Sequence, residues 1–140
     1  MTALIFIAIL SFLVIIHEAG HFLLARKYKI KVKEFGLGYP PRLLKLFRHQ
    51  GTIFSLNLIP FGGFVQLTGE NGAEEGVANN DSFHYKSAKA RLLVILAGVA
   101  INFIFGILAF AVVFYQLGIP KPLLGQARIG QIMPNSPAAE

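Results

Sequence analysis

Two long and almost uncharged runs dominate the pattern of hydrophobic and polar positions along the chain. The first extends from Ala3 to Ala25 and contains no Lys, Arg or Asp. The second extends from Leu92 to Leu117, contains no charged residue, and is followed by the helix-breaking sequence Gly118-Ile119-Pro120. Because about 20 apolar residues in a helix cross the hydrocarbon core of a bilayer, each run predicts a transmembrane helix.

The segment between these runs has the pattern of a small β-region. The Gly and Pro spacing from Glu34 to Pro41 excludes a helix. Thr52 to Leu58 alternates apolar and polar residues as a half-buried strand does, and a second short strand is predicted from Phe64 to Thr68. Pro60 to Gly63 predicts a turn between them. We expect a small sheet that packs on the membrane face or dips into it.

The predicted fold class is a mainly α-helical membrane protein, in which two transmembrane helices flank a small membrane-associated β-hairpin region. A polar loop without hydrophobic periodicity separates the β-region from the second helix. The predicted parts are residues 1–26 for the first helix, 27–69 for the β-region, 70–90 for the polar loop, 91–118 for the second helix and 119–140 for a linker with the beginning of another domain.

Composition narrows the possible chemistry. The chain is 54% hydrophobic and 14% charged, which excludes a disordered protein. It has no cysteine, so a disulfide framework, a thiolate metal site and a cysteine nucleophile are excluded. The net charge of +6 would suit a nucleic-acid partner, but the basic residues gather beside the first apolar run and form no separate basic domain. We therefore expect no nucleic-acid partner.

The basic residues also predict an orientation in the membrane. The positive-inside rule assigns residues 26–91 to the cytoplasmic side and both ends of the chain to the outside. A secretory signal peptide is disfavoured, because only Met1 and Thr2 precede the first apolar run and no basic segment precedes it. Eight of the 13 basic residues lie between the runs and soon after the first: Arg26, Lys27, Lys29, Lys31, Lys33, Arg42, Lys45 and Arg48.

The first apolar run contains the sequence His17-Glu18-Ala19-Gly20-His21, which has the form H-E-x-x-H. Its two imidazoles are four residues apart on one helical face, so both can bind one Zn²⁺. Glu18 is then the candidate general base that takes a proton from a zinc-activated water. His17 would lie about 21 Å along the helix from Ala3 in a core about 30 Å thick, toward the cytoplasmic side.

A less specific interpretation is that two His and a Glu merely occupy a buried helix. Near the middle of a bilayer, however, one charged residue costs about 2.5 to 3.5 kcal/mol on insertion scales. Three ionisable groups within five residues therefore need partners or a bound ion, which favours metal catalysis. Because hydrolysis requires water at that depth, a wet cavity built with the Gly-rich β-segment is expected.

Four segments in this order, HEAGH, FGLGYPP, NLIPFGGFV and RLLVILAGVAIN, resemble the site-2 protease family, and more narrowly its bacterial regulator of sigma-E protease group. The resemblance implies a zinc-dependent endopeptidase of the bacterial inner membrane. Such a protease cleaves transmembrane segments of substrate proteins, such as anti-sigma factors, during regulated intramembrane proteolysis. It also implies that His17 and His21 bind zinc and that Glu18 is the base.

The resemblance extends to residues outside the HEAGH sequence. Phe35 to Tyr39 corresponds to a β-element of the family that dips into the membrane near the site. Asn102 matches the Asn of a glycine-proline-x-x-asparagine motif, although Val99 replaces the proline. Contact with substrate and hydrogen bonding to a neighbouring helix are both open for Asn102. An edge of the predicted hairpin at Phe64 and Val65 is expected to bind an unwound substrate by strand addition.

A catalytic zinc usually has three protein ligands, and the sequence offers two. In the family the third is an Asp on a later transmembrane helix, beyond one or more PDZ domains. The only Asp here, Asp81, lies in the polar loop, and residues 127–140 resemble the opening of a PDZ domain. We therefore expect the chain to be an N-terminal portion of a longer enzyme and to be inactive alone.

Two alternatives remain open at this point. A non-catalytic membrane protein that binds metal or transmembrane substrates, such as a pseudoprotease, would use the same histidine pair. A soluble H-E-x-x-H peptidase would have to hold the second apolar run in a soluble core, which its length disfavours.

Overall fold

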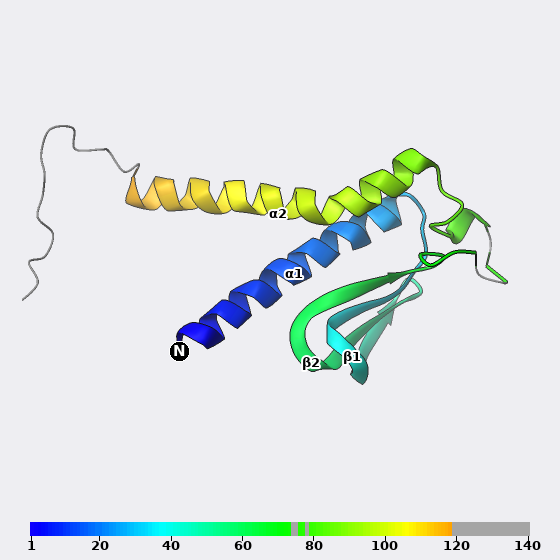
Figure 1. The fold of residues 1–140 in the computed structure, drawn as a ribbon, viewed down its shortest axis with the longest axis horizontal. Helices are drawn as coiled ribbons and strands as arrows, with labels where there is room; N and C mark the ends of the chain where they lie inside the picture. The colour runs from blue at the N-terminus through cyan, green and yellow to red at the C-terminus, as the bar shows by residue number, and fades with distance from the viewer. Residues whose placement is uncertain (74–75, 78, 119–140) are drawn as a thin grey trace, which may run out of the picture. The chain divides into compact units, whose positions relative to one another are not determined.

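The computed structural model describes residues 1–73, 76–77 and 79–118. The elements follow the order α1 (Thr2–Lys27), β1 (Val32–His49), β2 (Thr52–Leu67), the short 3₁₀ helix η1 (Asn79–Asp81) and α2 (Ala88–Leu117) (Figure 1). The two predicted helices and the β-region between them are therefore confirmed. The predicted linker and the resemblance to a PDZ domain fall on residues 119–140, outside the described residues.

The helical boundaries differ slightly from the predicted ones. The polar loop was predicted to extend to residue 90, but α2 begins at Ala88, where the hydroxyl of Ser87 accepts a hydrogen bond from the backbone N–H of Ala90. Residues 1–109 form one compact unit, which contains α1, the sheet and most of α2. In the second unit the structure describes the end of α2, where the rings of Phe110 and Phe114 stack with centroids 6.0 Å apart.

Both long helices have the length and composition of membrane-crossing segments. Most of their large apolar side chains are not covered by other parts of the chain, including Leu4 with 73% and Phe103 with 70% of its surface exposed. A soluble protein buries most of such a helix, whereas lipid leaves no penalty for apolar side chains at the surface. The exposure pattern therefore fits helices that face lipid along most of their length.

The sheet is formed by two long bent strands that provide four paired segments. Residues 32–37 pair with 63–67, and residues 42–49 pair with 52–57, both in antiparallel register. Residues 34–37 also pair with 53–56, and there the residue numbers rise together, so this inner pair runs in one direction. Segment 34–37 thus lies between two partners, while segments 63–67 and 42–49 form the two edges.

Residues with positive φ mark the bends between these segments. Gly38 has φ 78° at the bend within β1, and Gly51 has φ 87° between the strands. Gly62 has φ 65° inside β2, where the register with β1 reverses direction. Pro60 to Gly63 was predicted as a turn, but these residues lie within the continuous strand β2, which bends at Gly62. The backbone N–H of Gly62 donates to the Ser11 hydroxyl of α1 at 3.3 Å.

The predicted strands were partly right. Thr52 to Leu58 is extended as predicted, and the strand predicted from Phe64 to Thr68 ends one residue earlier, at Leu67. The N–H of Thr68 donates to the carbonyl of Lys31 at 2.9 Å, just before β1 begins. The outer segment from Arg42 to His49 was not predicted as a strand, since its sequence lacks strict alternation.

A small apolar core joins the end of α1 to the beginnings of β1 and α2. Its fully buried members include Ala25, Ile30 and Val94, with Phe83 packed against them. The carbonyl of Asp81 accepts a hydrogen bond from the N–H of Lys31 at 2.8 Å, which ties the connecting loop to the start of β1. The core therefore fixes the start of α2 beside the end of α1.

A buried polar cluster crosses the sheet at Glu34, whose side chain is almost fully covered. The Arg42 guanidinium donates to both carboxylate oxygens, from Nε at 2.9 Å and from a terminal nitrogen. The Ser55 hydroxyl donates to the same carboxylate at 2.5 Å. These hydrogen bonds, above all those from Arg42, lower the pKa of Glu34 below its ordinary value of 4.5.

The cluster predicts an acid-sensitive contribution to stability. Because the folded pKa of Glu34 lies below its unfolded value, its contribution is complete above that unfolded value and is lost as pH falls through the folded one. We expect Glu34→Gln to lower the thermal midpoint in detergent near neutral pH, and the difference from the wild type to shrink between about pH 5 and about pH 3. Asp81→Asn, at an exposed position, is the control. A difference that stays constant over this range would contradict the assignment.

Candidate functional site

The two histidines of the H-E-x-x-H sequence lie side by side on α1. Their ring centroids are 4.8 Å apart and the ring planes are inclined by 72°. The separation of His17 and His21 by one helical turn produces this proximity. Rings this close can each direct one nitrogen to a shared ion at about 2.0 to 2.1 Å.

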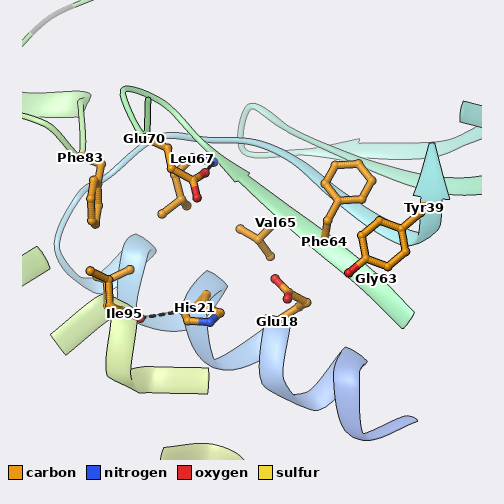
Figure 2. A pocket seen from close by; sticks show the side chains of 11 residues that line it. Glu18, His21, Tyr39, Gly63, Phe64, Val65, Leu67, Glu70, Phe83 and Ile95 are labelled. Atoms are coloured by element: carbon orange, nitrogen blue, oxygen red, sulfur yellow. Dashed lines mark hydrogen bonds between the residues drawn. The ribbon is translucent and has the colours of Figure 1, made fainter. Parts of the chain in front are cut away.

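His21 is oriented by a backbone group of α2. Its Nδ1 lies 2.7 Å from the carbonyl oxygen of Val94, which can only accept a hydrogen bond (Figure 2). Nδ1 of His21 therefore carries the proton, and Nε2 keeps its lone pair. Metal-binding histidines are commonly held in this way, with the second ring nitrogen bonded to a carbonyl or carboxylate.

His17 of α1 lies against the next two turns of α2, at Gly98 and Asn102. A Cβ atom added to Gly98 would lie 2.5 Å from Nε2, 2.6 Å from Cδ2 and 2.6 Å from Cε1 of the His17 ring. Nearly equal distances to three ring atoms mean that Gly98 lies over the face of the ring and not in its plane. The in-plane lone pair of Nε2 is thus not blocked by Gly98, while Nδ1 lies 3.5 Å from the amide nitrogen of Asn102.

The contact between the helices is close because Gly20 has no side chain. A Cβ atom at Gly20 would lie 2.6 Å from the carbonyl oxygen of Ala97 and 2.9 Å from the Ile101 side chain. The glycine within HEAGH therefore permits the approach that brings α2 onto both histidines. Small residues serve this purpose at many helix contacts in membranes.

Glu18 faces a different neighbour from the histidines. Its carboxylate points toward β2, where it lies close to the backbone of Val65 (Figure 2). Glu18 and His21 line one cavity of about 520 Å³ between α1, β2 and the start of α2. The other residues that line it are Tyr39, Gly63, Phe64, Val65, Leu67, Glu70, Phe83, Val94 and Ile95.

The edge of the sheet that faces this cavity is segment 63–67. The N–H of Leu67 points away from β1 to the Glu70 carboxylate at 3.4 Å. Donors two residues apart in a strand point to one side, so the N–H groups of Val65 and Gly63 share this direction. The sheet therefore presents a row of main-chain donors beside Glu18.

The donor set at the histidines fits a zinc ion. Two imidazoles stand together, the Nε2 lone pair of His21 is defined by the Val94 contact, and a carboxylate on the adjacent position of the helix reaches the same cavity as His21. Within residues 1–73, 76–77 and 79–118, no three His, Cys, Asp or Glu side chains converge as a complete metal site. His17 and His21 would hold the ion, and further ligands are not provided by the described residues.

The sequence-predicted site residues fall into two groups. Glu18, His21, Phe64 and Val65 line the cavity. His17, predicted as a zinc ligand, and Asn102, predicted as a substrate contact, are both absent from the cavity lining and lie against each other.

Sequence analysis did not identify the roles of Val94 and Gly98. The Val94 carbonyl has no signature in the sequence, because any residue would supply it. For Gly98 the available signal was its spacing of four residues from Asn102, which places both residues on one face of the helix.

Comparison with known proteins agrees with this geometry. A model of peptidase family M50 matches residues 5–136, so the chain belongs to peptidase family M50. It is 41% identical over 138 residues to a protein of Haemophilus influenzae named as a regulator of sigma E protease. It is 37% identical over 140 residues to the regulator of sigma-E protease RseP of Salmonella typhimurium. The similarity covers 96% of this chain in both cases. The resemblance to the site-2 protease family is therefore confirmed.

A third relative connects the family to zinc. A protein of Thermotoga maritima, named as a candidate zinc metalloprotease, is 37% identical over 142 residues, which cover 100% of this chain. The chain spans between 27% and 30% of the length of these three relatives.

The contact between Gly98 and His17 gives a test of the site. Gly98→Ala places a methyl group on the imidazole face, so we expect lower zinc content in the purified complete protein although alanine favours the helix. Gly106→Ala on the same helix is the matched control, because a Cβ there meets nothing within 4 Å. Zinc is measured per protein by atomic emission. Equal zinc content in both variants would show that the Gly98 contact is not needed.

Proposed function

We propose that this chain forms the catalytic part of an intramembrane zinc metalloprotease, an endopeptidase that hydrolyses peptide bonds within transmembrane segments. The observation that carries the proposal is the position of Glu18. Its carboxylate shares a cavity with His21, beside His17, and touches the outward main-chain edge at Val65. Membership of a peptidase family and relatives named as zinc metalloproteases support the same activity.

The chemistry divides between a metal and the chain. When bound, a zinc ion would lower the pKa of water and polarise a substrate carbonyl. His17 and His21 would hold the ion, and Glu18 would take the proton of the attacking water on its carboxylate and later deliver it to the departing amine. The Glu18 carboxylate lies beside the Val65 backbone in the cavity. We propose that the third zinc ligand comes from a residue outside the described part of the chain.

Substrate binding is proposed to use the sheet edge. A helical substrate shields its scissile carbonyl within its own hydrogen bonds, so it has to be extended before water can attack. The donors at Gly63, Val65 and Leu67 form the edge that an extended segment would join, and Phe64 lines the same cavity. Strand addition at this edge would bring a peptide bond close to Glu18.

Cellular context follows from charge and from the names of relatives. Relatives named as regulators of sigma-E protease support substrates of the anti-sigma-factor type in the bacterial inner membrane. The basic residues between the helices support a cytoplasmic β-region, with the active site toward that side and the N-terminus outside. We also propose that the enzyme includes a PDZ domain after α2.

Glu18 distinguishes a protease from a non-catalytic protein that binds metal or substrate. We expect Glu18→Gln to reduce cleavage of a transmembrane substrate by about 10²-fold to 10⁴-fold, because the amide cannot accept the proton. Zinc content should remain that of the wild type. The assay is cleavage of a tagged transmembrane substrate by the complete protein in proteoliposomes. Cleavage at the wild-type rate would refute the catalytic role and leave the binding alternative.

The outward edge of the sheet gives a second test. Val65→Pro removes a donor that faces the cavity, whereas Val65→Thr keeps the N–H and the branched shape and serves as the control. We expect the proline variant to lose cleavage with its zinc content unchanged, and the threonine variant to cleave like the wild type. Phe64→Pro should also reduce cleavage by disturbing the pairing with β1. Normal cleavage by Val65→Pro would argue against strand addition.

A further inference from the structure

Three positions of α2 spaced four residues apart meet the two histidines. The Val94 carbonyl binds Nδ1 of His21, Gly98 lies under the ring of His17, and Asn102 reaches Nδ1 of His17. We propose that Asn102 is a positioning residue, whose side-chain oxygen accepts the Nδ1 proton of His17 and keeps Nε2 of His17 available to a metal. This inference rests on the proposed function and adds to it the residue that orients the first histidine.

The first argument concerns an unpaired atom. Within the described residues, the side-chain oxygen of Asn102 is buried and has no hydrogen-bond partner. A buried polar atom without a partner is costly, and such atoms are rare in folded proteins. The amide nitrogen of the same residue lies 3.5 Å from Nδ1 of His17. If the amide oxygen and nitrogen of Asn102 exchange places, the oxygen therefore has Nδ1 of His17 as its hydrogen-bond partner.

The second argument concerns the tautomer of His17. A neutral imidazole has one N–H and one lone pair. If the Asn102 amide donates to Nδ1, the proton of His17 must be on Nε2, and a metal is then excluded from that nitrogen. Turning the amide by half a turn directs its oxygen to Nδ1, moves the proton there and frees Nε2. In this arrangement the buried oxygen of Asn102 has a hydrogen-bond partner, and Nε2 of His17 is available to a metal.

The third argument is the symmetry with His21. An acceptor on α2 already fixes the Nδ1 proton of His21, and that acceptor is the Val94 carbonyl. His17 lies over Gly98, one turn further along, and its Nδ1 is next to the Asn102 side chain. Both rings thus take their orientation from α2. The side chain of Asn102 orients His17, and the backbone carbonyl of Val94 orients His21.

The cavity lining separates this role from contact with substrate. Glu18, His21, Phe64 and Val65 line the cavity, whereas His17 and Asn102 do not, and Asn102 lies next to His17. A side chain behind the histidine acts on the metal through that histidine. The predicted consequence of its loss is a weaker metal site, with weaker cleavage as a result.

The test measures zinc affinity of the complete protein in detergent, by competition with a chromogenic chelator. Asn102→Leu keeps the size but removes the acceptor, and we expect its zinc affinity to fall by about 10-fold to 100-fold. Asn102→Asp keeps an acceptor oxygen at the same position and should retain most of the affinity. Phe103→Leu, at an exposed neighbouring position of α2, should bind zinc like the wild type. The visible spectrum of the Co²⁺-loaded protein should change in Asn102→Leu alone.

Each other result counts against the proposal. Wild-type zinc affinity in Asn102→Leu overturns it, and a simultaneous loss of cleavage would assign Asn102 to the substrate. An equal loss in the Leu and Asp variants would reduce its role to packing. If Asn102→Leu does not accumulate, Asn102→Ala provides the same comparison with Asn102→Asp. Failure of the proposed function is a separate result, namely unchanged zinc binding after His17→Ala and His21→Ala.

Discussion

The close contact of α1 and α2 at two glycines is the constraint on which the site depends. Gly20 allows the backbone of α2 to approach at Ala97, and Gly98 makes room for the His17 ring. A side chain at either position would separate the helices or displace the imidazole. Because of this contact, the Val94 carbonyl of α2 reaches Nδ1 of His21, and the Asn102 side chain of α2 reaches Nδ1 of His17.

The β-region supplies what two packed helices could not. Beyond its first turn a helix uses its main-chain donors internally, whereas an edge strand offers a row of outward N–H groups on the side of Glu18. Segment 63–67 takes that position because β1 pairs with it on one side and with segment 53–56 on the other. The Glu34 cluster and the Ser11 contact hold the bent strands to each other and to α1.

Polar groups among the described residues are concentrated where the elements meet. The helices expose apolar side chains over most of their surface, while His17, Glu18 and His21 each face a partner from α2 or β2. An ionisable group surrounded by hydrocarbon is costly unless it is paired. The intersection of three elements lowers this cost and leaves a cavity of about 520 Å³ for water and substrate.

The sequence by itself determined the two apolar helices and the histidine pair, because these depend on local composition and on spacing within one element. Tertiary structure alone decided that the Val65 backbone lies beside Glu18 and that Asn102 lies behind His17. Those contacts join residues 47 and 85 positions apart. They depend on how closely helices and strands pack, which hydrophobic periodicity along one segment does not encode.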